Sequence, residues 1–162
     1  MSAVDLQDGP AGKNDQVRAF SCIGNLLGSH GRLTPQRDAI LAPGRPSMTY
    51  GALWAWTNHT LRQLRKIGVG RSDRVSVVLP QGPDAAVATL GVSASAVCVP
   101  LNSSFTADES RRYFGELGIA ALVTRPNVDT ASRDVAGMLG IPVIDLWCSP
   151  KERSGECSVL GR

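Results

Sequence analysis

Residues 79–84, Leu-Pro-Gln-Gly-Pro-Asp, are the first candidate for a ligand-binding segment, and the ligand to consider is a phosphate group. They follow an apolar run and precede a helical pattern, the position at which many nucleotide-binding folds hold phosphate. The segment has a single glycine and no lysine, and Asp84 in the first helical turn would compete with an anion. We therefore favour a tight strand-to-helix connection. No G-x-G-x-x-G motif and no Walker-type loop occurs in the sequence.

A second polar segment, residues 100–104, offers an amide and two hydroxyls where another apolar run ends. These groups could contact a ligand. Asn and Ser are also ordinary turn and capping residues, and we favour that interpretation.

The histidines and tryptophans give no clear catalytic signal. His30 stands in a glycine-flanked segment that we expect to be a loop, and His59 lies in a helical pattern without an acidic or cysteine partner at a fixed spacing. No G-x-S-x-G elbow or Ser-His-Asp order is present, so we assign no catalytic residue. Trp54 and Trp56 are two positions apart, which predicts one core contact and one contact at the rim.

The four cysteines are not spaced like the ligands of a structural zinc site, and we predict no metal site. Since no secretory leader precedes them, we interpret them as reduced thiols of a cytosolic protein, with disulfides as the alternative. Cys98 is expected to pack in the core as a small hydrophobe. The four are Cys22, Cys98, Cys148 and Cys157.

Length and charge narrow the classes of function. A chain of 162 residues suits one domain, and its 17 Lys and Arg against 14 Asp and Glu are dispersed, which gives nucleic-acid binding no support. Residues 85–107 carry no charge, but they are rich in Ala and Val and include Gly91. A buried helix followed by a buried strand explains this stretch better than a membrane span.

The elements that must position these residues alternate along the chain. We predict a short helix over 17–28, a hairpin over 38–49, and a helix that Thr49 caps and Gly68 ends. After it, we predict four apolar strands that are separated by helices. One of these helices begins with a Thr106–Glu109 capping box. These strands cover 75–79, 96–100, 120–124 and 142–146.

Such alternation predicts an α/β fold: a doubly wound, mainly parallel sheet with helices on both faces, preceded by a short helix and a hairpin. We expect a flexible tail over 1–16, an α/β subdomain over 17–147 and an irregular tail over 148–162. Ligands of such folds bind at the carboxyl ends of the strands, where the segments 79–84 and 100–104 lie.

Four blocks stand in order along the chain: Met-Thr-Tyr-Gly-Ala-Leu at 48–53, residues 64–75, Val-Val-Leu-Pro-Gln-Gly-Pro-Asp at 77–84, and Val-Pro-Leu-Asn at 99–102. Together they resemble the N-terminal part of the adenylate-forming, or AMP-binding, superfamily of acyl-CoA synthetases, luciferases and peptide synthetase adenylation domains. The resemblance is continuous from about residue 34 to 146, and the segment 105–114 looks most like oxalate-CoA ligases and related bacterial synthetases. Gln81 departs from the family, where relatives often have Asn.

This resemblance implies ATP, Mg²⁺ and CoA for the complete family enzyme, which makes an acyl-adenylate and passes the acyl group to a thiol. The family's lysine-terminated phosphate loop and catalytic lysine lie downstream of the matching blocks, and residues 151–162 resemble no such loop. No catalytic residue is carried over, and no cofactor is expected on this chain alone. The leading hypothesis is a truncated or split N-terminal subdomain that is inactive by itself. Alternatives are a binding module that docks on a partner chain or on itself, and a flavodoxin-like binder of small ligands.

Overall fold

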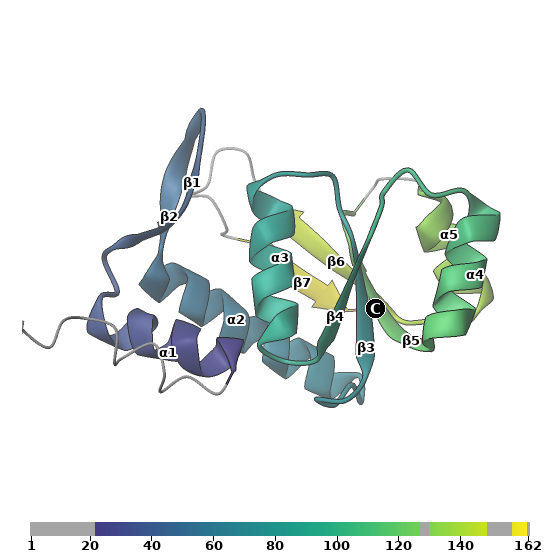
Figure 1. Cartoon of the computed structure of the whole chain (residues 1–162), viewed down its shortest axis with the longest axis horizontal. Helices are drawn as coiled ribbons and strands as arrows, with labels where there is room; N and C mark the ends of the chain where they lie inside the picture. Colours follow the sequence, from purple (N-terminus) through teal and green to yellow (C-terminus); the bar gives the residue numbers. More distant parts are fainter. Residues whose placement is uncertain (1–21, 127–129, 149–156, 162) are drawn as a thin grey trace, which may run out of the picture.

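The computed structural model describes residues 22–126, 130–148 and 157–161, and within them five helices and seven strands alternate (Figure 1). The predicted order of elements is confirmed. In chain order they are α1 (Ile23–Leu33), β1 (Asp38–Ala42), β2 (Arg45–Thr49), α2 (Tyr50–Lys66), β3 (Arg74–Val78), α3 (Pro83–Ser93), β4 (Val97–Leu101), α4 (Ala107–Leu117), β5 (Ile119–Thr124), α5 (Ala131–Met138), β6 (Val143–Cys148) and β7 (Cys157–Gly161).

The main sheet has the strand order β4-β3-β5-β6-β7, and β1 and β2 form a separate antiparallel hairpin. The pairs β3–β4, β3–β5 and β5–β6 are parallel, and β7 is antiparallel to β6. The predicted doubly wound, mainly parallel sheet is therefore confirmed. One detail was wrong: β4, expected to be buried, is an edge strand, and Val97 at its start is 44% exposed. Pro100 suits that edge because it cannot donate to a further strand.

Helices cover both faces of the sheet, and each face has its own core (Figure 1). Val75 and Val77 of β3 pack toward α2 and α3, whereas Val78 packs toward α4 and α5, where Phe114 is buried. This alternation follows from the two-residue period of a strand, and from Val75 to Val78 β3 is buried on both faces, with Ser76 as its one polar residue.

Helix α2 begins and ends as predicted. The Thr49 hydroxyl accepts a hydrogen bond from the Ala52 backbone N–H at 3.3 Å, and Gly68 just after the helix has a φ of +84°. Trp56 is buried in the core and Trp54 is half-buried against α1, which confirms the prediction of two different environments.

The first helix differs from its prediction. Residues 17–21 lie outside the described part of the chain, and α1 runs through Gly28 and Gly31 to Leu33, so His30 is helical rather than in a loop. The glycines serve packing here: a Cβ at Gly31 would lie 2.6 Å from the Trp54 Cβ. The helix continues through them because α2 approaches closely at this point.

The expected irregular tail over 148–162 contains β7, whose backbone pairs with β6 from Ile144–Gly161 to Cys148–Cys157. Irregularity was therefore the wrong expectation for residues 157–161. Pairing of this kind covers what would otherwise be an open edge of β6. The expected tail over 1–16 lies outside the described residues.

The predicted capping box begins α4. The Glu109 backbone N–H donates to the Thr106 hydroxyl at 3.3 Å, and the Thr106 backbone N–H donates to the Glu109 carboxylate at 2.8 Å. That backbone hydrogen bond, with a second from the Thr106 hydroxyl, lowers the pKa of Glu109.

We expect the capping box to make stability depend on pH. Because the folded pKa is depressed, the Glu109 contribution is present above the ordinary glutamate value of about 4.3 and is lost as pH falls through the folded value. Melting temperatures of the wild type and Glu109→Gln should differ at pH 7 and converge as the pH drops below about 4. A gap that stays constant with pH would contradict this.

Candidate functional site at the carboxyl edge of the sheet

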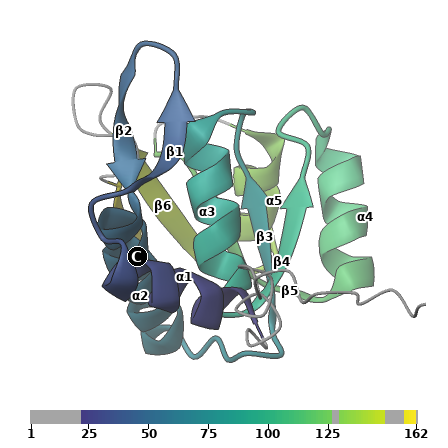
Figure 2. The ribbon, with the colours of Figure 1, turned by 60° about the vertical axis from the view of Figure 1, so that its left-hand side comes forward.

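The carboxyl ends of β3 and β5 form a topological switch point. These strands are neighbours, but α3 follows β3 on one face of the sheet and α5 follows β5 on the other. In doubly wound folds the connecting loops part at such a point and leave a crevice for ligands. Figure 2 shows the β1–β2 hairpin at the same end of the molecule as the arrowheads of β3 and β4.

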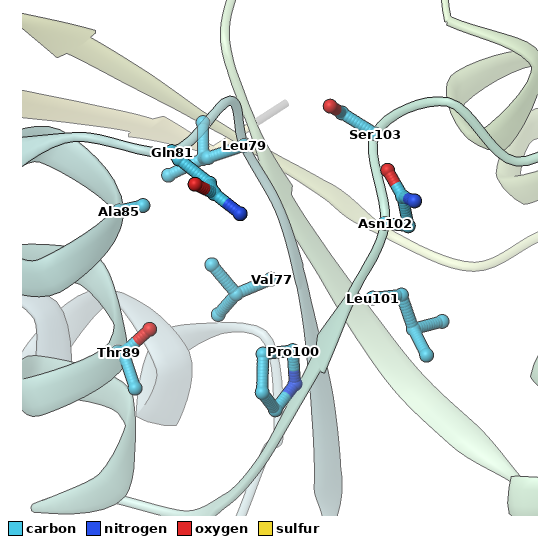
Figure 3. A pocket seen from close by; sticks show the side chains of 9 residues that line it. All are labelled: Val77, Leu79, Gln81, Ala85, Thr89, Pro100, Leu101, Asn102 and Ser103. Carbon is cyan, nitrogen blue, oxygen red and sulfur yellow. The ribbon is translucent and has the colours of Figure 1, made fainter.

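A first cavity of about 360 Å³ lies between β3, β4 and α3. Its size falls within the range of small-molecule sites. Figure 3 shows the side chains that line it, with the Gln81 carboxamide and the Thr89 hydroxyl directed into the space between α3 and β4. The lining combines apolar Val77, Leu79, Ala85, Pro100 and Leu101 with uncharged polar Gln81, Thr89, Asn102 and Ser103.

This cavity joins the two polar segments that the sequence presented separately. Segments 79–84 and 100–104 meet because β3 and β4 are hydrogen-bonded neighbours, with Val78 opposite Leu101. The Asn102 side-chain oxygen accepts a hydrogen bond from the Ser104 backbone N–H at 2.9 Å. The turn interpretation therefore holds for that oxygen, while Gln81 and Ser103 face the cavity.

A second cavity, of about 260 Å³, lies on the other side of the 79–84 loop, between that loop and the hairpin. Gln81 lines both cavities. The second one is charged: Arg45 of β2 donates to Asp84 at 2.9 Å, and Arg125, just after β5, donates to the other oxygen of the same carboxylate. Asp84 is therefore shared by two ion pairs, which join the hairpin, the start of α3 and the segment after β5.

Arg133 of α5 connects these ion pairs to β6. Its guanidinium donates to the Arg125 backbone oxygen at 2.7 Å and also to the Asp145 carboxylate of β6. The backbone that carries Arg125 is thus held from α5, which limits the positions its side chain can take.

The sequence places Asp84 in a candidate segment and Arg125 at the carboxyl end of a predicted strand, but it does not predict that Asp84 pairs with Arg125 and Arg45. Arg45 belongs to a hairpin whose docking site is set by tertiary packing, 39 positions away from Asp84. Arg125 carried the better signal, because it stands directly after a predicted parallel strand, where ligand-facing side chains gather.

The other candidates lie away from this edge. The His30 ring stacks on Tyr50 with centroids 4.8 Å apart, and the His59 ring is 3.3 Å from the Gln63 side-chain nitrogen on α2. Cys98 is half-buried against the α2–α3 core, and burial raises the pKa of its thiol. Neither histidine reaches the two cavities.

Metal-binding side chains do not gather in the parts of the chain that the structure describes: it shows no group of three His, Cys, Asp or Glu residues able to hold an ion. Across the same residues, no helix has the length and apolar character needed to cross a membrane.

The lining of the two cavities suits binding rather than proton transfer. It contains two guanidiniums, one carboxylate, amides and hydroxyls, and it lacks histidine, lysine and cysteine. Lys66, the one lysine in the described residues, ends α2 and lines neither cavity. The edge can hold a ligand by hydrogen bonds and charge, and its one carboxylate, Asp84, is already paired with Arg45 and Arg125.

Comparisons with known proteins agree with one another. A family model described as "AMP-binding enzyme" matches residues 29–154. Among curated proteins, "Probable CoA ligase CCL9" of Humulus lupulus is 34% identical over 106 residues, covering 65% of this chain and 20% of that protein. The acetyl-coenzyme A synthetase of Gemmatimonas aurantiaca is 33% identical over 97 residues, covering 56% of this chain and 15% of that protein.

Solved structures support the fold. The o-succinylbenzoate CoA synthetase of Bacillus subtilis has a TM-score of 0.64 at 21% identity, over 75% of this chain and 31% of that chain. The N-terminal domain of FACL13 from Mycobacterium tuberculosis has a TM-score of 0.62 at 23% identity, over 75% of this chain and 30% of that chain. At these identities the likeness concerns the fold alone.

The chain spans a fifth or less of the length of the two curated relatives. The family match nonetheless covers most of the chain, and the fold of the chain resembles those of the two solved structures. The chain belongs to the AMP-binding enzyme family.

Proposed function

We propose that this chain serves as the N-terminal α/β segment of an ATP-dependent carboxylic acid–CoA ligase and carries no adenylation chemistry by itself. The family match over residues 29–154 is the observation that carries the proposal. The names of the two curated relatives, a CoA ligase and an acetyl-CoA synthetase, supply the reaction class. A cytosolic location, expected from our interpretation of the cysteines as reduced thiols, belongs to the same proposal.

The two cavities do not fit the ATP and Mg²⁺ that the family reaction needs. The charged cavity, at about 260 Å³, is below the range of about 300 Å³ and upward that holds drug-sized ligands. Its one carboxylate, Asp84, already has both oxygens paired with arginines. The larger cavity is lined by no charged side chain. Neither of these two cavities is therefore assigned to ATP or Mg²⁺, and we propose that ATP, Mg²⁺ and CoA bind to the complete enzyme.

ATP–pyrophosphate exchange tests the absence of chemistry. The purified chain, incubated with ATP, Mg²⁺ and a panel of short and long carboxylic acids, should exchange labelled pyrophosphate no faster than a blank without protein. Since neither cavity offers a lysine or an unpaired carboxylate that could hold Mg²⁺, the polyphosphate would lack the electrostatic stabilisation that the reaction needs. Exchange that depends on one of the acids would overturn this part of the proposal.

A second function, a binding module that docks on a partner chain or on itself, is favoured by the apolar side chains that the described surface exposes. Leu33 and Leu41 are 73% and 74% exposed, and Met138 is 72% exposed. Contiguous apolar patches mark interaction sites, whereas single exposed apolar side chains are common on monomers, so this function requires these residues to share one docking face. Sedimentation that shows a monomer at all concentrations, together with a pull-down that recovers no partner, would count against this function.

A further inference from the structure

The charged cavity at the carboxyl edge has a lining with an excess of positive charge. It is bounded by the hairpin on one side and by the loop after β3 on the other, and its charged lining consists of Arg45, Asp84 and Arg125. Two positive groups and one negative group leave this lining with a net charge of +1. Arg133 and Asp145 beneath it form a balanced pair and do not change that sum.

The carboxylate lies inside and the guanidiniums reach toward solvent. The Asp84 side chain is 5% exposed, whereas those of Arg45 and Arg125 are 24% and 38% exposed. A guanidinium has five N–H donors in a fixed fork, and Asp84 accepts a hydrogen bond from each arginine. Donors therefore remain on the outer side of both arginines, beside the cavity.

Asp84 also holds the two arginines in place. Fixing long side chains before a ligand arrives reduces the entropy that binding must overcome. The Arg125 backbone is held in addition by Arg133 at 2.7 Å. This arrangement answers the objection raised by the sequence, that Asp84 would repel an anion: both of its oxygens are paired, so its charge is compensated.

We propose that this cavity binds a small oxyanion, a phosphate or the carboxylate of a short acid, between Arg45 and Arg125, with Asp84 as the residue that positions both. Two planar guanidiniums suit a ligand with two or more acceptor oxygens. The volume of about 260 Å³ matches a small anion or the acidic end of a larger molecule. The proposal does not depend on the ligase function, because it rests on the cavity and its charges.

Isothermal titration tests it, with potassium phosphate and potassium acetate as separate probes and potassium chloride holding the ionic strength constant. The wild type should show saturable binding of at least one of the two, with a dissociation constant on the order of 1 mM. Tighter binding of phosphate identifies a phosphoryl ligand, and tighter binding of acetate identifies a carboxylic acid. Absence of saturable binding of both anions up to about ten times that concentration would overturn the proposal.

Anion binding by variants distinguishes binding at this site from the general attraction of anions to a basic protein. Arg125→Gln and Arg45→Gln should each weaken binding about tenfold or more, since each removes a charge and a fork of donors. The control is Arg112→Gln on α4, which removes the same charge from an exposed arginine that lines neither cavity. Equal weakening by the control would contradict the proposal. Arg125→Lys, which keeps the charge, should bind with intermediate affinity and provides the test if a glutamine variant fails to fold.

Discussion

Replacing Gly91 by alanine is expected to destabilise the fold by about 2–3 kcal/mol, although alanine is the better helix former. Gly91 is buried in α3 where this helix crosses α2. A Cβ at this position would lie 2.1 Å from Cζ3 of Trp56, a distance that real Cβ atoms do not show. Since Trp56 is itself 5% exposed and packed in the core, its ring can move away only by disturbing its neighbours.

Gly115 provides the matched control, because it also lies inside a helix, α4, but has no atom within 4 Å of an added Cβ. Gly115→Ala should stabilise the protein by about 0.5–1 kcal/mol through the smaller entropy of the unfolded chain. Urea unfolding of the two variants beside the wild type measures both effects. Equal effects of the two substitutions would show that helix propensity, and not contact with Trp56, decides the outcome at Gly91.

Replacing Asp84 by alanine is expected to cost about 2–3 kcal/mol and to loosen the hairpin. Removing one partner of a buried ion pair costs about 3–5 kcal/mol when the other is left buried, and the partial exposure of Arg45 and Arg125 reduces this figure. Because Arg45 joins β2 to the start of α3 through Asp84, hydrogen exchange of the β1–β2 amides should accelerate.

An exposed ion pair gives the comparison for Asp84. Glu116→Gln removes the partner of Arg112 on α4, where the two side chains are 56% and 69% exposed, and it should cost no more than about 0.5 kcal/mol. Urea unfolding and hydrogen exchange measured on both variants distinguish a structural centre from an ordinary surface charge. A loss at Asp84 no larger than at Glu116, with unchanged exchange in the hairpin, would contradict the role of this network.

The main sheet could be predicted from the sequence because its signals are local. Val75 to Val78 form a run apolar enough to be covered on both faces, and Gly68 and Gly118 end helices at positive φ, a conformation that glycine adopts without strain. The capping box at Thr106 is equally local, since both of its partners lie within four residues.

The errors have a common physical cause, which is that packing at a distance overrides local signals. Gly28 and Gly31 look like the end of a helix, but they lie inside α1 because Trp54 packs against them. The exposure of β4 depends on strand order, which the strand's own residues do not encode. The sequence of the hairpin likewise does not predict that Arg45 donates a hydrogen bond to Asp84. Segment 79–84, which lines both cavities, could therefore be identified from the sequence, whereas the contribution of the hairpin to the charged cavity could not.

We propose that this chain is a working scaffold of an adenylate-forming ligase and that the adenylation chemistry resides in the rest of that enzyme. The most direct test is acetate-dependent ATP–pyrophosphate exchange by a chimera in which residues 29–154 replace the matching segment of the acetyl-CoA synthetase of Gemmatimonas aurantiaca. We expect the chimera to catalyse exchange while the present chain alone does not. A chimera that folds and binds ATP but catalyses no exchange, or exchange by the chain alone, would contradict the claim.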